Sequence, residues 1–336
     1  MPSSSACQPL FLPDGRRLSV DVGERRLTLL VDDQPLLAFV RDGEAWQVPQ
    51  ETATSQLPFA LWAFAGWSFA SEPDLQQLRL KLAEDQVPAD LLHQGLLNRD
   101  GSGGLQIERA AFWQMPQPWL IAPGAGVYPQ LQRMSEGRRH PLRPPKPEGE
   151  VYRRFDARLG SWISLRTLNI EQDLERFNRW QNHPRVSAFW DEAGSLAQHR
   201  AYLEKLAADP HSLTLIGCFD DQPFAYYEAY WAKEDRIAPF YPVGDYDRGI
   251  HMLVGEDSHR GPHKVQSWLN ALVHYLLLDD PRTQRIVAEP RADNARMIGH
   301  MQAQGFWREK EFDFPHKRAA LMVQSREVFF ERCRLC

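Results

Sequence analysis

A histidine and a glutamate occupy positions where two neighbouring strands could bring them together. His251 lies in a predicted strand, residues 249–254, and shares one face of it with Leu253. Glu289 ends a short apolar strand, residues 286–289, predicted to run parallel to the first. A carboxylate beside a histidine orients the ring and stabilises its charged form, which suits a general base. A histidine in a core strand can equally be a structural residue held by hydrogen bonds.

The loop that follows residues 249–254 has side chains suited to phosphate. It leads from Gly255 through His263 and Lys264 into the amphipathic helix 265–278. A helix N-terminus attracts anions because its first N–H groups are unpaired and its dipole is positive there. Basic side chains at this end oppose the dipole unless an anion binds between them. The loop therefore predicts a phosphate-bearing ligand, with an ordinary strand-to-helix turn as the simpler alternative.

Aromatic and acidic residues predict the walls of a pocket for a small cationic amino acid. Carboxylates pair with an ammonium group, and aromatic rings shield the reacting nitrogen. Each candidate could also be a core or rim residue. The candidates are Trp190, Glu228, Trp231 and Asp247.

Two polar residues open the last predicted helix, residues 294–304, which Gly305 closes. Asp293 and Asn294 both favour the N-cap position. Asp293 is also the next candidate for accepting a proton if His251 is structural.

The elements of the second half of the chain alternate in a recognisable order. After Pro210 the pattern predicts two long strands joined across Asp220 and Asp221 as a hairpin. The whole order is β-α-α-β-β-β-α-β-α-β-β. The predicted elements are strand 161–168, helices 171–181 and 195–208, strands 212–219, 223–233 and 249–254, helix 265–278, strand 286–289, helix 294–304, and strands 307–312 and 319–324.

The first half predicts a smaller α+β domain without a catalytic constellation. Strands are expected over 18–30 and 35–40, helical spacing over 74–92, and a break at 101–104. Residues 137–150 are dense in proline and charge and contain no aromatic residue, which is typical of an extended linker. We therefore expect an N-terminal accessory domain over 1–136, a linker over 137–150 and a catalytic domain over 151–336.

The composition of the chain argues against nucleic acid and membranes as binding partners. The 336 residues include 39 Lys and Arg against 44 Asp and Glu, a formal charge of -5 that does not favour nucleic acid or an anionic membrane. The first 17 residues have no apolar signal region, and no stretch is apolar enough to span a membrane. The four cysteines, Cys7, Cys218, Cys333 and Cys336, are too sparse for a disulfide framework. We expect a cytoplasmic enzyme without a metal.

The order of elements, with a strand, loop and helix at its centre, resembles that of the GNAT acyltransferases. The family binds acyl-CoA through an Arg/Gln-x-x-Gly-x-Gly/Ala loop. Arg260 matches the first position, whereas His263 and Val265 stand where glycines usually lie. This departure is shared by the siderophore-biosynthesis acetyltransferases, which acetylate N-hydroxylysine, N-hydroxyornithine or N-hydroxylated diamines to form hydroxamates. The resemblance covers nearly all of residues 150–330 and is densest in the runs 261–268 (GPHKVQSW), 278–283 (LDDPRT), 289–295 (EPRADNA) and 311–318 (EFDFPHKR).

The resemblance implies an α+β fold with a mixed, splayed central sheet and acetyl-CoA as co-substrate. It implies that His251, oriented by Glu289, removes a proton from the hydroxylamine, and that a backbone N–H of residues 252–254 polarises the thioester carbonyl. Association with other enzymes of the siderophore pathway would be consistent with it. The residues that it assigns to the cofactor are Met252, Leu253, Val254, Arg260, Gly261, His263, Lys264, Val265 and Asn294.

Two other functions fit the same sequence. One is a GNAT enzyme that acetylates an unmodified amine, such as an aminoglycoside or a polyamine. The other is a subunit that binds acyl-CoA but has lost the chemistry, for which the residues at 263 and 265 are the best support.

Overall fold

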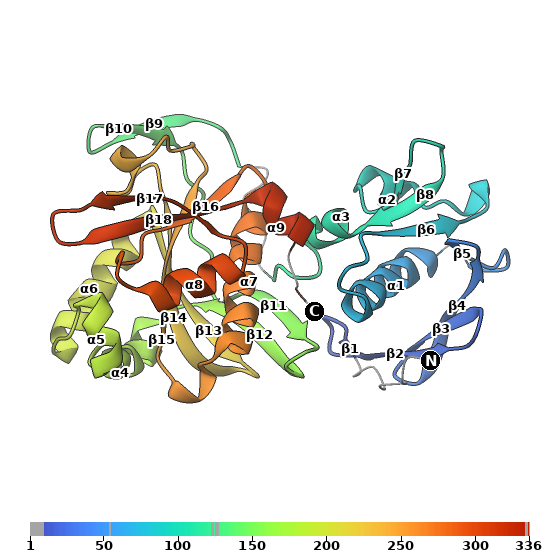
Figure 1. Cartoon of the computed structure of the whole chain (residues 1–336), viewed down its shortest axis with the longest axis horizontal. Helices are drawn as coiled ribbons and strands as arrows, with labels where there is room; N and C mark the ends of the chain where they lie inside the picture. Colours follow the sequence, from blue (N-terminus) through green and yellow to red (C-terminus); the bar gives the residue numbers. More distant parts are fainter. Residues whose placement is uncertain (1–9, 54, 122–123, 125–127, 333–334, 336) are drawn as a thin grey trace. The chain divides into compact units, whose positions relative to one another are not determined.

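The computed structural model describes residues 10–53, 55–121, 124, 128–332 and 335, which form two compact units (Figure 1). Of these residues, the first unit contains those up to Pro118, together with Phe155–Ser161 and Leu335. The second contains the described residues of Trp119–Arg154 and those from Trp162 to Arg332. Cys7, Cys333 and Cys336 lie outside the described residues.

The first unit is an eight-stranded sheet in the order β1-β2-β3-β4-β5-β6-β8-β7, with the helix α1 packed on it. Helix α1, Leu57–Ser71, is almost entirely apolar because the sheet and α3 cover it, and its Phe64 stacks on Phe39 of β4 at 4.2 Å. The strands are β1 Leu10–Phe11, β2 Arg17–Val22, β3 Arg26–Val31, β4 Gln34–Asp42, β5 Ala45–Gln47, β6 Gln77–Lys81, β7 Asn98–Arg99 and β8 Leu105–Glu108. The other helices are η1 Glu84–Gln86, α2 Ala89–His93 and α3 Arg109–Gln114.

The structure differs from two expectations in this unit. The stretch 74–92, expected to be helical, contains β6, in which buried and exposed residues alternate with the period of a strand. The expected strand 18–30 is two strands, β2 and β3, which turn at Gly23 and pair with each other.

The second unit contains a mixed eight-stranded sheet in the order β11-β12-β13-β14-β15-β16-β18-β17. Its strands follow the predicted alternation closely, and the hairpin between β13 and β14 turns at Asp220 and Asp221, both with positive φ. The strands are β11 Glu150–Asp156, β12 Ser161–Thr167, β13 Ser212–Phe219, β14 Gln222–Trp231, β15 Arg248–Val254, β16 Arg285–Ala288, β17 Trp307–Asp313 and β18 Arg318–Ser325.

The sheet opens between β15 and β16, its parallel pair. Their ladder has two residue pairs, Arg248 with Ile286 and Gly249 with Val287. Beyond them β15 continues to Val254, whereas β16 ends at Ala288. This is the mixed, splayed sheet expected of the GNAT fold.

Helices cover both faces of this sheet. Helices α4 (Ile170–Gln181), α5 (Pro184–Trp190) and α6 (Leu196–Ala208) share one buried cluster with Tyr226 of β14. Trp268 of α7, Pro262–Asp279, stacks on Tyr227 at 5.6 Å. Successive strand residues point to opposite faces, so α7 lies on the other side. The remaining helices are η2 Ala238–Phe240, η3 Asp257–His259, α8 Ala295–Ala303 and α9 Arg326–Arg332.

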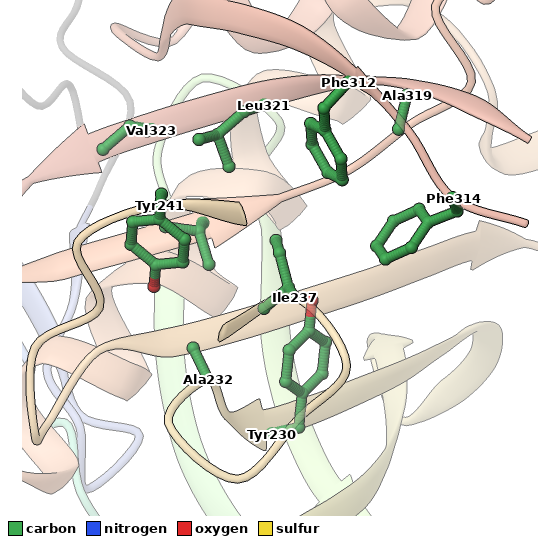
Figure 2. Packing of buried hydrophobic residues seen from close by; sticks show 10 residues of the cluster. Tyr230, Ala232, Ile237, Tyr241, Phe312, Phe314, Ala319, Leu321 and Val323 are labelled. Carbon is green, nitrogen blue, oxygen red and sulfur yellow. The ribbon is translucent and has the colours of Figure 1, made fainter. Parts of the chain in front are cut away.

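Aromatic residues from distant segments pack beside the opening of the sheet. Figure 2 shows Tyr230 of β14 below the loop residue Ile237, with Phe312 and Phe314 of the β17 region above. This cluster supports the residues around Glu289, since Val287 of β16 belongs to it.

The expected linker is not extended. Residues Arg138–Pro141 form β10, which pairs with β9, Gln132–Ser135, in a two-stranded hairpin. Arg143 makes a buried bidentate ion pair with Glu234, at 2.6 and 2.7 Å. Residues 137–150 therefore pack within the second unit, and the boundary between the units precedes Trp119.

Candidate active site

His251 lies between two glutamates. Its Nδ1 is 2.8 Å from Glu228 Oε2, and its Nε2 is 2.5 Å from Glu289 Oε1. The antiparallel register pairs Glu228 of β14 directly with His251 of β15. Glu289 follows β16, whose separation from β15 leaves room for the imidazole between them. The structure thus brings together the predicted pair of His251 and Glu289, and it adds a second carboxylate.

Both carboxylates are buried and held by further hydrogen bonds. The hydroxyls of Tyr202 and Tyr226 donate to Glu228 Oε1 at 2.5 and 2.9 Å. The hydroxyl of Tyr230 donates to Glu289 Oε2 at 2.7 Å. Each of the four carboxylate oxygens therefore has a partner. Glu228 Oε2 and Glu289 Oε1 contact the imidazole, Glu289 Oε2 accepts from one hydroxyl, and Glu228 Oε1 accepts from two. A carboxylate satisfied in this way is fixed in position and stays ionised.

The charges of these groups are coupled. Burial by itself would lower the pKa of His251, but the charge of Glu289 and hydrogen bonds to both glutamates outweigh it and raise the pKa to about 10. Burial would raise the pKa of Glu289, but the charge of His251 lowers it to about 2. Burial would also raise the pKa of Glu228, but the hydrogen bond with His251, the charge of His251 and the hydrogen bonds from Tyr202 and Tyr226 together lower it. At neutral pH the ring is therefore an imidazolium between two carboxylates.

Two of the four predicted acceptor residues, Glu228 and Trp190, lie at this centre, and the other two do not. The Trp190 ring is 6.2 Å from the His251 ring. Trp231, however, is three positions beyond Glu228 in β14, roughly 10 Å along the strand and on the opposite face. It packs between the guanidinium groups of Arg143 and Arg248, at 4.2 and 4.1 Å.

Asp247, the other of these two candidates, is buried and already paired. It accepts hydrogen bonds from Arg285 Nη2 at 2.7 Å and from the Tyr241 hydroxyl at 3.1 Å. Neither Trp231 nor Asp247 therefore lies beside His251, and their assignment as acceptor contacts stays a prediction.

The residues that open α8 have local partners. Asn294 caps the helix by accepting from the Met297 N–H at 3.2 Å, as predicted. Asp293 is exposed and pairs with Arg291 at 2.6 Å. This pairing makes Asp293 a weaker candidate for proton transfer than the buried glutamates.

The end of β15 and its loop are anchored to the helical side of the sheet. Arg185 of α5 donates to the carbonyl oxygens of Val254 and Gly255, at 2.9 and 3.3 Å. A side chain at Gly255 would lie 2.1 Å from the Trp180 ring, so only glycine fits there. Arg185 Nε is buried and has no hydrogen-bond partner among the described residues. Sequence patterns did not single out Arg185, because it lies far from the loop in the chain.

The residue that precedes helix α7, Gly261, has a backbone conformation that only glycine adopts easily. Gly261 has φ +123°, and a Cβ there would be 2.9 Å from the His263 ring. Its carbonyl accepts from the N–H groups of Lys264 and Val265. Lys264 Nζ lies 3.1 Å from His259 Nδ1, and Arg260 pairs with Asp257 at 3.3 Å. Basic side chains thus gather at this helix N-terminus, which is the arrangement that holds a phosphate.

The splayed sheet, the loop that leads into α7 and the buried histidine between two glutamates are the arrangement expected of an acyltransferase of the GNAT class. The family model described as an acetyltransferase (GNAT) domain matches residues 169–314. N(6)-hydroxylysine O-acetyltransferase of Escherichia coli is 49% identical over 225 residues, which cover 67% of this chain and 71% of that protein. The chain therefore belongs to the GNAT acetyltransferase family and is an enzyme.

Two further comparisons agree with this assignment. A hydroxyornithine transacylase of Ajellomyces capsulatus is 36% identical over 313 residues, covering 81% of this chain and 71% of that protein. The structure of an uncharacterised protein from Bacillus halodurans superposes with a TM-score of 0.53 at 30% identity, covering 56% of this chain and 95% of that one. The predicted fold class and family are confirmed.

The described part of the chain shows neither a cluster of metal ligands nor a membrane-spanning helix. It contains no group of three or more His, Cys, Asp or Glu side chains placed to hold a metal ion. None of its helices is long and apolar enough to cross a membrane.

Proposed function

We propose that this enzyme transfers an acetyl group from acetyl-CoA to the hydroxylamine of an N-hydroxylated amine, such as hydroxylysine or hydroxyornithine, in siderophore biosynthesis. The observation that supports it most is the imidazole between two glutamates beside the open edge of β15. The names of the relatives from Escherichia coli and Ajellomyces capsulatus support the choice of acceptor. The proposed setting is the cytoplasm, together with other enzymes of the same pathway.

Acetyl-CoA would enter where β15 and β16 separate. The N-terminus of α7, with Gly261, His263, Lys264, Val265 and the nearby Arg260, would hold its phosphates. Backbone N–H groups of Met252, Leu253 and Val254 that face the opening would polarise the thioester carbonyl. Asn294 would lie beside the pantetheine arm.

The transfer itself is a direct displacement. The hydroxylamine attacks the carbonyl carbon, the new bond to carbon forms, and the C–S bond breaks to release the thiolate of CoA. A hydroxylamine is largely uncharged near neutrality, so it is ready to attack without losing a proton first. The proton that it loses is accepted by the His251 centre and passes on to the thiolate or to water.

The contacts of His251 require a rearrangement before the ring can accept a proton. Both nitrogens of His251 contact carboxylates, and the ring is charged in the free enzyme. To accept a proton the ring must be neutral, and one of its nitrogens must face the acceptor. We infer that the acceptor takes the place of one carboxylate contact, and that Glu289, beside the opening of the sheet, is the one displaced.

One assay tests the proposed function. Release of CoA thiol is measured with acetyl-CoA and N-hydroxylysine, N-hydroxyornithine and N-hydroxycadaverine, each beside its unhydroxylated parent. The product is then tested with ferric iron, which gives a coloured complex with a hydroxamate but not with an O-acetyl hydroxylamine. Thiol release that requires the N-hydroxyl group, with a coloured product, is the expected result. Equal rates with the parent amines would assign the enzyme to unmodified amines, and binding without turnover would make it a non-catalytic subunit.

A further inference from the structure

An arginine of α5 contacts the edge of β15 that faces the opening of the sheet. The N–H of Gly255 donates to the Phe224 carbonyl of β14 at 2.8 Å. Successive residues of an antiparallel strand turn their backbone groups to alternate edges, so the N–H and the carbonyl of Val254 face away from β14. On that side β16 has already ended, at Ala288. Arg185 of α5 reaches this edge, and its Nη1 donates to the Val254 oxygen at 2.9 Å.

The same guanidinium holds the turn that follows β15. Arg185 Nη2 donates to the Gly255 carbonyl at 3.3 Å and pairs with Asp257 Oδ1 at 3.1 Å. Asp257 also pairs with Arg260, in the loop proposed to hold the phosphates of acetyl-CoA. One side chain therefore connects the strand edge with the loop that leads into α7.

An open strand edge presents carbonyl oxygens as well as N–H groups. The thioester oxygen becomes negative as the acceptor attacks, so N–H groups stabilise it and a nearby carbonyl oxygen destabilises it. The hydrogen bond from Arg185 occupies the Val254 oxygen and places a positive charge beside it. The N–H groups of Val254 and of Met252, two positions earlier, face the same edge and are the donors that it offers to a ligand.

We propose that Arg185 is a positioning residue for the acyl donor. By holding the carbonyl oxygens of Val254 and Gly255, it orients the end of β15 so that N–H groups meet the thioester. This role rests on the proposed function through acetyl-CoA as the donor, and it does not depend on the choice of acceptor. Loss of the guanidinium impairs binding and reaction of the donor, and it leaves acceptor binding and the proton transfer at His251 unaffected.

The test compares two donors that share the same thioester. Acetyl-CoA carries the phosphates that the loop before α7 would hold, whereas S-acetylpantetheine lacks them. Values of kcat and KM are measured by thiol release with N-hydroxylysine, for the full-length wild-type enzyme and for Arg185→Met, Arg185→Lys and Asp257→Asn. Methionine keeps a long apolar side chain without the guanidinium, and lysine keeps the charge without the planar fork of donors. Arg200→Met is the matched control, because Arg200 pairs with Glu171 on the surface.

The variants should separate the strand edge from the phosphate loop. Arg185→Met should lower kcat/KM by roughly 10- to 100-fold with both donors, because a displaced strand edge misaligns the thioester. Arg185→Lys should recover part of this loss. Asp257→Asn should lower kcat/KM with acetyl-CoA alone, since only that donor has phosphates. Arg200→Met should behave as wild type with both donors.

Two further readouts distinguish positioning from a general loss of structure. In Arg185→Met, KM for the acceptor and the pH dependence that His251 gives to kcat/KM should stay at their wild-type values. A folded Arg185→Met enzyme with wild-type kcat and KM for both donors would make Arg185 a structural residue only and would overturn the proposal. A loss confined to acetyl-CoA would show that Arg185 acts through the phosphate loop, and it would overturn the placement of its effect at the thioester.

Failure of the proposed function has a different signature. If the wild type releases no thiol with any N-hydroxylated acceptor, the proposed function fails, and calorimetry with acetyl-CoA in the absence of acceptor tests the role of Arg185. A Kd raised by roughly 3- to 10-fold in Arg185→Met would support this role. An unchanged Kd would overturn it.

Discussion

Replacing Glu289 with glutamine should move the ascending limb of the pH–rate profile, on which kcat/KM rises as His251 loses its proton, to lower pH. In the wild type the pKa of His251 is raised to about 10, and the charge of Glu289 is the largest contribution that raises it. At pH 7.5 the ring would then be neutral in only about one molecule in 300. One opposite charge in contact changes a pKa by roughly 1–3 units. Glutamine keeps the shape of the side chain and removes that charge, so the neutral fraction should rise by about 10-fold or more at pH 7.5.

The measurement is kcat/KM by thiol release from pH 6 to 10.5, with the spontaneous hydrolysis of acetyl-CoA subtracted. Since kcat/KM reports the free enzyme, the wild-type value should rise with pH toward about pH 10. The limb for Glu289→Gln should lie at least about one pH unit lower. Glu171→Gln is the control, because Glu171 is exposed and pairs with Arg200 on the surface.

Two results would refute this reasoning. A folded Glu289→Gln enzyme with an unchanged limb would show that the limb does not belong to His251. A limb at higher pH would show that Glu289 does not stabilise the charged ring.

Four further predictions follow from the same contacts. His251→Ala should lower kcat by roughly 10²–10⁴-fold, and calorimetry should find the Kd for acetyl-CoA unchanged; a folded variant with near-normal turnover would assign proton transfer elsewhere. The pKa of His251 is higher in the folded than in the unfolded chain, so the charged ring stabilises the fold fully below about pH 6.5. This stabilisation is lost as the pH rises toward about 10. Urea unfolding should therefore show a steeper fall in the free energy of unfolding over that range for the wild type than for His251→Gln. Gly261→Ala should weaken acetyl-CoA binding and lower Tm, since φ is +123° and the new Cβ would meet the His263 ring; an unchanged Kd in calorimetry would contradict the role of this turn. Trp231→Ala should destabilise the fold by about 3–5 kcal/mol in urea unfolding while KM for the acceptor stays the same, and a selective rise in KM would restore Trp231 to the acceptor site.

The patterns of the second half determined most of its elements. Each strand from β12 to β18 and helices α4, α6, α7 and α8 were predicted within a few residues, because apolar periodicity and capping residues are local properties. Helix α7 begins earlier than predicted, since Pro262 is well suited to the first turn of a helix. The first half was harder to predict. The local pattern there favours a helix over β6, and composition favours a linker over residues 138–141, although these residues pair as a strand with β9. Pairing partners are chosen by tertiary contacts, which local propensity does not specify.

The active centre was only partly contained in the sequence. His251 and Glu289 could be paired because both lie on predicted neighbouring strands. The role of Glu228 depended on the antiparallel register, which places it opposite His251, and a shift of one residue would have turned it to the other face. The same register places Trp231 on the opposite face and leaves Asp247 at the far end of β15, so residue type alone could not show that they lie away from His251. The sequence by itself determined the family and the chemical groups available, whereas the tertiary structure decided which of those groups meet and what charges they hold.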